Sequence, residues 1–130
     1  MFCKTTRGIT VSVQPTYLAS QSSPDENRFV WAYHIVIENQ GDRTVRLIAR
    51  HWRITDEHGQ VEDVRGQGVV GEQPTLNPGE RFEYTSGAPL ATPSGIMVGT
   101  YQMETVDGDA FDVAIPAFSL DSPHETRRVH

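Results

Sequence analysis

Large apolar residues alternate strictly with smaller or polar ones over the segment 29–37, and this limits most severely what the chain can fold into. The apolar positions are Phe29, Trp31, Tyr33, Ile35 and Ile37. Successive side chains of a strand point to opposite faces, so this spacing puts all of them on one face of an extended segment. We therefore predict a central β-strand here, with Trp31 in the core.

Shorter alternating segments recur along the chain, too close together for helices between them. They are 9–14, 60–64, 82–84, 97–106 and 110–118. His58-Gly59 and Asp107-Gly108 suit hairpin turns, and Asn77-Pro78-Gly79 suits a type II turn. No segment has a sustained helical period free of Gly and Pro, so we expect no helix longer than two turns.

The segment 44–55 changes phase in its middle. Val45 and Leu47 share one parity, whereas Ile48, Trp52 and Ile54 share the other. An extra residue in one strand of an antiparallel pair produces such a break. We predict a bulge or a change of sheet near Leu47 and Ile48, with Trp52 in the core.

About seven short strands with frequent turn residues indicate an all-β fold. We predict an antiparallel two-sheet sandwich of fibronectin type III or immunoglobulin kind. At 130 residues the chain has the size of one domain, and neither a repeat nor a long linker divides it. The expected single domain spans 1–130, with its core at about 6–120 and a flexible polar tail at 121–130.

The charge balance excludes some classes of partner. The net charge is −6 and Lys4 is the only lysine, so we expect no binding to DNA or RNA through phosphate neutralisation. Four arginines gather in one segment, but apolar residues and carboxylates accompany them, which favours a solvated strand face over an anion-binding stripe. They are Arg43, Arg46, Arg50 and Arg53.

Apolar runs and the cysteine count bound the setting of the protein. No apolar run approaches the ~18 residues of a membrane span, so no membrane association is expected. The N-terminus lacks the residue order of a signal peptide, which favours the cytoplasm. Cys3 is the only cysteine and is interpreted as an exposed bystander, because a disulfide within the chain is excluded. The oligomeric state stays open.

We predict neither a catalytic residue nor a metal site, and no cofactor. Ser86 lacks the Gly-x-Ser-x-Gly elbow and its strand-to-helix setting, so a turn-forming hydroxyl is favoured over a nucleophile. The histidines are scattered along the chain. One hairpin could collect a divalent ion weakly, although solvated turn charge is the favoured interpretation. That hairpin carries Asp56, Glu57, His58, Glu62 and Asp63.

The string Gly66-Gln67-Gly68-Val69-Val70-Gly71 matches the Gly-x-Gly-x-x-Gly spacing of dinucleotide-binding proteins. In those proteins a helix begins at the loop and directs its amides at the pyrophosphate. Pro74 and Pro78 follow too closely for a helix, so we predict that the segment is not such a site. We expect it to connect the two sheets while its valines cover the core edge; an anion nest of backbone amides stays open.

The segment 87–95 contains Pro89, Pro93 and two glycines, so we predict a stiff loop. Leu90 has no alternating partner there. It is either an exposed contact for a partner, which a rigid loop favours, or a cap on the core.

Four segments together resemble the ApaG family, and the resemblance extends over about 6–118. They are Gln21-Ser22-Ser23-Pro24, Ala49-Arg50-His51-Trp52, the run from Gly66 to Pro74, and Tyr84-Thr85-Ser86-Gly87. The resemblance implies a fibronectin type III-like sandwich and a bacterial protein. It also implies an association with tolerance of cobalt and magnesium and with a neighbouring diadenosine tetraphosphate hydrolase.

Eukaryotic relatives of that family occur as modules in F-box proteins and in a DNA polymerase partner, which favours protein recognition. The leading hypothesis is therefore a non-enzymatic binding module that contacts a protein partner through a sheet edge or end loops. The alternative is a small-ligand protein that binds phosphate, a nucleotide or a divalent cation near the glycine-rich loop. A hydrolase with an unrecognised site is the third class. The candidate contact residues are Gly66, Gly68, Gly71, Ser86, Gly87, Pro89, Leu90 and Pro93.

Overall fold

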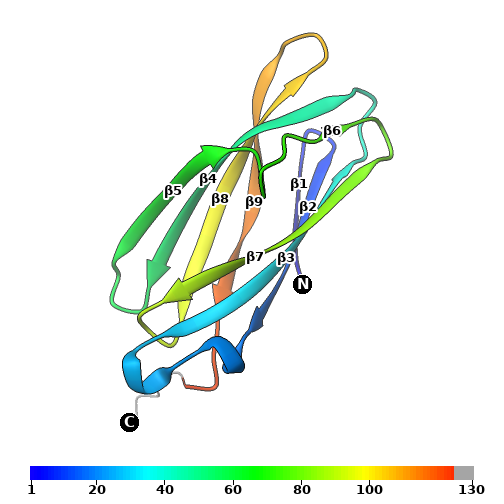
Figure 1. Ribbon diagram of the computed structural model, residues 1–130. Helices are drawn as coiled ribbons and strands as arrows, with labels where there is room; N and C mark the ends of the chain where they lie inside the picture. The colour runs from blue at the N-terminus through cyan, green and yellow to red at the C-terminus, as the bar shows by residue number, and fades with distance from the viewer. Residues whose placement is uncertain (125–130) are drawn as a thin grey trace.

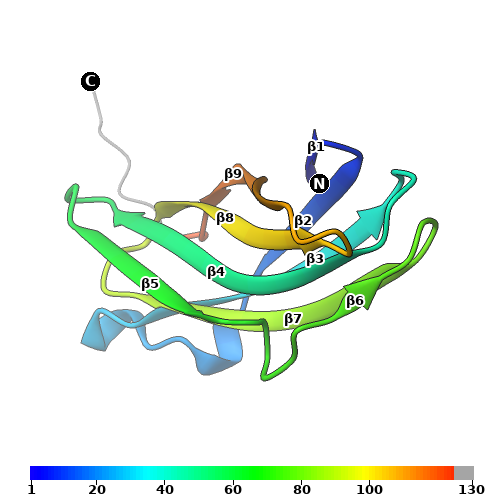
Figure 2. The same ribbon diagram turned by 90° about the horizontal axis from the view of Figure 1, so that it is seen from above.

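The computed structural model describes residues 1–124, and it consists of two antiparallel sheets packed face to face (Figures 1 and 2). The first sheet has the strand order β1-β2-β3-β7, and the second has the order β5-β4-β8-β9 with β6 paired to β4. The strands are β1 (Phe2–Thr6), β2 (Ile9–Tyr17), β3 (Phe29–Asn39), β4 (Val45–Asp56), β5 (Val61–Gln67), β6 (Thr75–Leu76), β7 (Arg81–Leu90), β8 (Gly95–Thr105) and β9 (Ala110–Leu120). The predicted all-β sandwich is confirmed.

Two strands beyond the predicted seven complete the sheets. β1 carries exposed polar side chains between its ends, and β6 contains two residues, so neither has an alternating apolar pattern to reveal it. Part of the tail expected to be flexible, residues 125–130, lies outside the described residues.

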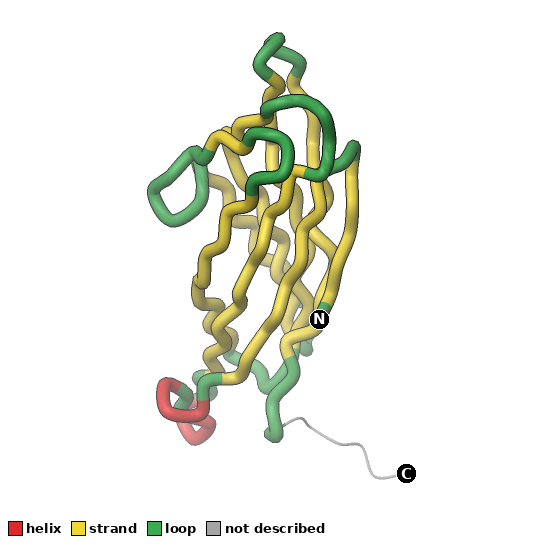
Figure 3. The backbone as a smooth tube through the Cα atoms, turned by 90° about the vertical axis from the view of Figure 1, so that its right-hand side faces the viewer, coloured by secondary structure: helices red, strands yellow, loops and turns green. Residues whose placement is uncertain are grey.

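The predicted turns form, and the loops gather at the two ends of the sandwich (Figure 3). Gly59 and Gly108 adopt φ of +82° and +88° in their hairpins, and Gly79 adopts +88° after Pro78, as a type II turn requires. The helical structure in residues 1–124 is confined to two 3-10 turns, Ala19–Gln21 and Pro24–Glu26. These residues include no helix long and apolar enough to cross a membrane.

The core lies between the sheets and is dominated by the residues that alternate in the sequence. Trp31 and Ile35 of β3 are almost completely buried, as predicted. Trp52 of β4 is buried as well, and its ring packs edge-on against Tyr33 and Phe118, with centroid separations of 5.4 and 5.9 Å. The aromatic rings therefore join the two sheets across the centre of the sandwich.

β4 carries the predicted bulge, located between Leu47 and Ala49 in its pairing with β8. Leu47 faces the core before the bulge, and Trp52 faces the core after it. Because of the extra residue, the even-numbered positions of β4 face the core after the bulge, whereas the odd-numbered positions face it before the bulge. Arg50 is therefore directed into the space between the sheets, where it lines a cleft with Tyr33 and Trp52. The predicted solvated face is wrong for Arg50.

The predicted loop at 87–95 is wrong over its first half. β7 extends to Leu90, with Gly87 paired to Ala32 and Pro89 paired to Val30. Proline is tolerated because β7 is an edge strand, where one side of the backbone has no ladder partner to lose. Ser86 likewise lies within β7, opposite Tyr33, and not at a loop entrance. Only residues 91–94 connect β7 to β8.

Candidate functional site

The two long sides of the sandwich differ. On one side β1 and β2 pack against β9. On the other side β7 and β5 are the edge strands of their sheets, and a cleft of about 220 Å³ opens between the sheets. We call it the open-edge cleft. It is lined by Tyr33, Arg50, Trp52, Ile54, Glu62, Val64, Ser86, Gly87, Ala88, Pro89 and Met97.

Arg50 is held in place by the start of the glycine-rich loop. Its Nη1 donates hydrogen bonds to the carbonyl oxygens of Gln67 and Gly68, at 3.2 and 2.9 Å. The guanidinium lies over Gly66, where a Cβ atom would stand 2.7 Å from Nη1. The ion pairs formed by residues 1–124 do not include Arg50. A half-buried cation therefore stands in the cleft beside carbonyl oxygens and without an ion pair, although the carboxylate of Glu62 lines the same cleft.

Three tyrosines bring hydroxyl groups to the same region of the interior. The hydroxyls of Tyr84 and Tyr101 are 2.6 Å apart, and Tyr33 stands opposite Ser86 in the β3–β7 ladder. Burial raises the pKa of each tyrosine above its ordinary value, and the nearby positive charge of Arg50 opposes that shift in all three. The phenols are consequently neutral at physiological pH. Tyr84 and Tyr101 bond to each other, so Tyr33 is the tyrosine that brings a donor to the cleft.

Trp52 contributes a further donor to the wall of the cleft. The residue is 2% exposed, and its indole N–H has no hydrogen-bond partner among residues 1–124. A Cβ on Gly99 of β8 would lie 3.0 Å from Cε3 of the ring, so the ring packs closely on β8. Buried donors without partners are uncommon in proteins and point to a ligand or solvent contact.

The glycine-rich segment divides between a strand and a loop. Gly66 belongs to β5, whereas Gly68 and Gly71 have φ of +63° and +81° in the loop that follows. The amide of Gly68 donates to the carbonyl of Ile48 at 2.8 Å, so it is not free to bind an anion. Val69 is 1% exposed and covers the core edge as predicted, but Val70 is 56% exposed and does not. The segment then leads to β6, with no helix between. Because β5 and β6 both pair with β4, the prediction that this segment connects the two sheets is wrong.

The other candidate residues lie at or beside the open edge. Ser86, Gly87 and Pro89 line the cleft directly. Leu90 is half-buried and packs against the core, in the capping role that was one of its two alternatives. Pro93 lies in the short β7–β8 connection, where its carbonyl accepts a hydrogen bond from Ser122. The structure thus brings Gly66 and the Ser86–Pro89 segment to one site, joined by Arg50.

The acidic hairpin is engaged in local contacts. Asp56 accepts hydrogen bonds from the amides of His58 and Gln60, both at 2.9 Å. Asp63 lies 2.9 Å from Nε2 of His51, and this hydrogen bond, together with Arg53, holds the pKa of Asp63 below its ordinary value. Residues 1–124 contain no cluster of three or more His, Cys, Asp or Glu side chains placed to hold a metal ion.

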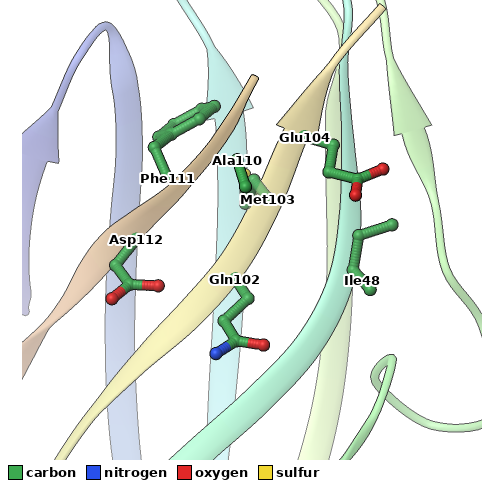
Figure 4. A pocket seen from close by; sticks show the side chains of 7 residues that line it. All are labelled: Ile48, Gln102, Met103, Glu104, Ala110, Phe111 and Asp112. Carbon is green, nitrogen blue, oxygen red and sulfur yellow. The ribbon is translucent and has the colours of Figure 1, made fainter. Parts of the chain in front are cut away.

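Two other depressions have a different chemistry. One lies beside the bulge, on β4, β8 and β9, and Figure 4 shows the carboxylates of Glu104 and Asp112 around it. The other, of about 490 Å³, lies at one end of the sandwich, where Arg7, Arg43, Asp42 and Asp109 mix both signs of charge. Neither contains an unpartnered buried donor, so the open-edge cleft is the better candidate.

Fold and cleft together define a small antiparallel sandwich of fibronectin type III kind with one open side. Its sequence matches the family model of the ApaG domain over residues 19–105. The chain belongs to the ApaG family.

Relatives agree with that assignment over the whole chain. A protein named ApaG from Paramagnetospirillum magneticum is 65% identical over 130 residues, which is 100% of both chains. Protein ApaG from Parvibaculum lavamentivorans is 62% identical over the same length, again 100% of both. A crystal structure described as an ApaA protein from Bordetella pertussis has a TM-score of 0.86 and 50% identity, covering 89% of this chain and 94% of that one.

Sequence reasoning missed the polar content of the cleft. Arg50 was grouped with three exposed arginines, and the tyrosines were indistinguishable from ordinary core residues. The signal that could have found Arg50 was the phase break itself, because a bulge at Ile48 gives Arg50 the same parity as Trp52.

Proposed function

We propose that this chain is a non-enzymatic, cytoplasmic binding module that recognises a protein partner at the open edge of its sandwich. One observation carries the proposal: β5 and β7 are both edge strands, and they flank a cleft whose lining includes one unpartnered donor, the indole N–H of Trp52. An exposed edge can accept an added strand through backbone hydrogen bonds, while pockets beside it select side chains.

The family's association with cobalt and magnesium tolerance fits an indirect role in this proposal. Within the acidic hairpin, Asp56 accepts hydrogen bonds from backbone amides, Asp63 contacts His51 and Arg53, and Glu57 accepts a hydrogen bond from Ser94. We place metal tolerance with the partner of this module and not at a metal site on the module.

The small-ligand alternative at the glycine-rich loop has weaker support. The amides of Gly68 and Val69 are used within the structure, the first by Ile48 and the second by Glu72 at 2.8 Å. A backbone nest for phosphate would require such amides to be free.

Site-specific photocrosslinking in living cells tests the proposal. A photoreactive residue replaces Glu83 on β7 or Glu62 on β5, and the matched control carries it at Lys4 on β1, where the side of the sandwich is closed. The expected result is the same discrete adduct from both open-edge positions and none from Lys4. Equal adducts from all three positions, or none from β5 and β7, would contradict the proposal.

A further inference from the structure

The open-edge cleft has a chemistry specific enough to name the group it receives. We infer that Arg50 anchors a carboxylate of an extended peptide in this cleft, with Tyr33, Ser86 and Trp52 as neighbouring donors. The inference rests on the proposed function, since it identifies what the partner presents at the open edge.

The charge of Arg50 is the first argument. Cations that are partly removed from water are normally paired with an anion, because desolvation without a partner is costly. Residues 1–124 give this guanidinium only two backbone carbonyls, both bonded to Nη1. Its remaining N–H groups form a planar fork that matches the two oxygens of a carboxylate.

The wall opposite and beside Arg50 is the second argument. Tyr33 and Ser86 bring neutral hydroxyls from the first sheet, and Trp52 brings its unpartnered indole N–H from the second. Each of these groups can donate to an oxygen, and the indole cannot accept a hydrogen bond at all. The set therefore suits an acceptor-only ligand such as a carboxylate.

Charge separates a carboxylate from a phosphate compound. Glu62 lies on the rim, and the chain carries a net charge of −6. A phosphate of about −1.5 to −2 charge meets more repulsion there than a single carboxylate does.

The edge strands explain why the carboxylate belongs to a peptide. β5 and β7 border the cleft from the two sheets, and an extended peptide paired with either strand can direct alternate side chains toward the sandwich interior. The backbone pairing then supplies affinity, and Arg50 selects the acidic residue.

Peptide titration of the full-length chain at pH 7 tests the inference directly. The probe is an acetylated, amidated Thr-Val-Glu-Val-Thr peptide, followed through the NMR signals of the Trp52 indole N–H and the Gly66 and Gly68 amides. We expect saturable shifts at these sites and about tenfold or weaker binding of the peptide with Gln in place of Glu. Equal affinity for both peptides, or no shift at the Trp52 indole, would overturn the inference.

Further probes identify the source of the oxyanion. A Gln peptide with a free C-terminus tests whether a terminal carboxylate binds instead of a side chain, and either carboxylate supports the inference. Inorganic phosphate is the third probe. Tighter binding of phosphate than of the Glu peptide at the same signals would replace the carboxylate assignment.

Variants connect the binding to Arg50. Arg50→Gln is expected to reduce affinity for the Glu peptide about tenfold, and Arg50→Lys to restore only part, because an ammonium lacks the planar fork. Arg53→Gln, on the outer face of the same strand, is the matched control and should bind as the wild type does. If Arg50→Gln fails to fold, the Glu and Gln peptides on the wild type still decide the question.

The two levels of proposal fail in different ways. Open-edge crosslinks that persist at full yield in Arg50→Gln, together with equal Glu and Gln peptide affinities, would refute the carboxylate assignment and leave protein recognition standing. Carboxylate binding at Arg50 with no open-edge adduct would refute protein recognition as proposed.

Discussion

The closed and open sides of the sandwich differ in which side chains fill the space between the two sheets. On the closed side, Phe2 of β1 packs on Phe118 of β9, and the guanidinium of Arg7 lies 4.5 Å from the centre of the Phe111 ring. On the open side, Arg50 spans β4 and β5 while the sheets leave a cleft between them. Apolar contact therefore seals one side, and polar groups keep the other accessible.

This difference indicates that the closed side contributes mainly to stability and the open side mainly to selective binding. An apolar seam is strong and nonspecific, because it depends mainly on the area removed from water. A half-buried arginine with hydroxyls around it contributes less to stability, but it is selective for what can enter. We expect substitutions on the two sides to differ accordingly.

Phe118→Ala should produce the largest effect. Its ring contacts Phe2, Tyr33 and Trp52, so its removal leaves a cavity where the closed side meets the core. We expect the free energy of unfolding to fall by about 3–5 kcal/mol. Urea denaturation measures the change, and a loss under about 1 kcal/mol would mean that the closed side is not sealed by this ring.

Tyr84→Phe should cost less, about 1–3 kcal/mol, because it leaves the buried hydroxyl of Tyr101 without its partner. The double change Tyr84→Phe with Tyr101→Phe removes both polar atoms and should be less destabilising than the sum of the single changes. Urea denaturation of the four proteins completes the cycle. Strict additivity would show that the two hydroxyls do not interact.

Alkaline pH should lower the stability of the fold. Burial raises the pKa of Tyr33, Tyr84 and Tyr101 in the folded chain, so the unfolded tyrosines ionise first, near their ordinary pKa of 10. Their stabilising contribution is complete below pH 10 and is lost as the pH rises toward the folded values. Urea midpoints from pH 8 to pH 11 measure the loss. An equally steep loss in the Tyr84→Phe, Tyr101→Phe double variant would contradict this origin.

Gly66→Ala should have the smallest effect on stability and a clear effect on the cleft. The new methyl group meets the flexible end of Arg50, which can move aside, so we expect a change within about 1 kcal/mol. Arg50 then loses its position over β5, and affinity for the Glu peptide should fall. Arg53→Gln is the control, since Arg53 pairs with Asp63 on the outer face of β4 and does not line the cleft. Unchanged peptide binding in Gly66→Ala would show that Gly66 does not position Arg50 for binding.

The fold was largely predictable because its residues act locally. Alternation in β3, the glycines of the hairpins and the phase break in β4 each depend on near neighbours in the sequence. The extension of β7 through Pro89 was not predictable, because it depends on which strand lies at the sheet edge. That information resides in the order of the strands and not in the segment itself.

The candidate site was predictable only in part for the same reason. The sequence points to Gly66 and Ser86 through a loop-like context, but both lie in strands. Their proximity to Arg50 arises from two edge strands of different sheets meeting at one side of the sandwich. The Tyr84–Tyr101 pair joins strands of different sheets, and the sequence pattern of neither strand predicts it.

The bulge in β4 makes the protein sensitive to the deletion of a single codon. A point mutation replaces one side chain, but loss of the single codon for the extra residue would exchange the two faces of the strand from that point to Asp56. His51 and Arg53 would be driven inward, while Arg50 and Trp52 would be expelled to the surface, and burying an arginine and a histidine in place of a tryptophan is incompatible with this core. The core position of Trp52 and the cleft position of Arg50 therefore both depend on the length of β4, so the loss of one codon would remove both together.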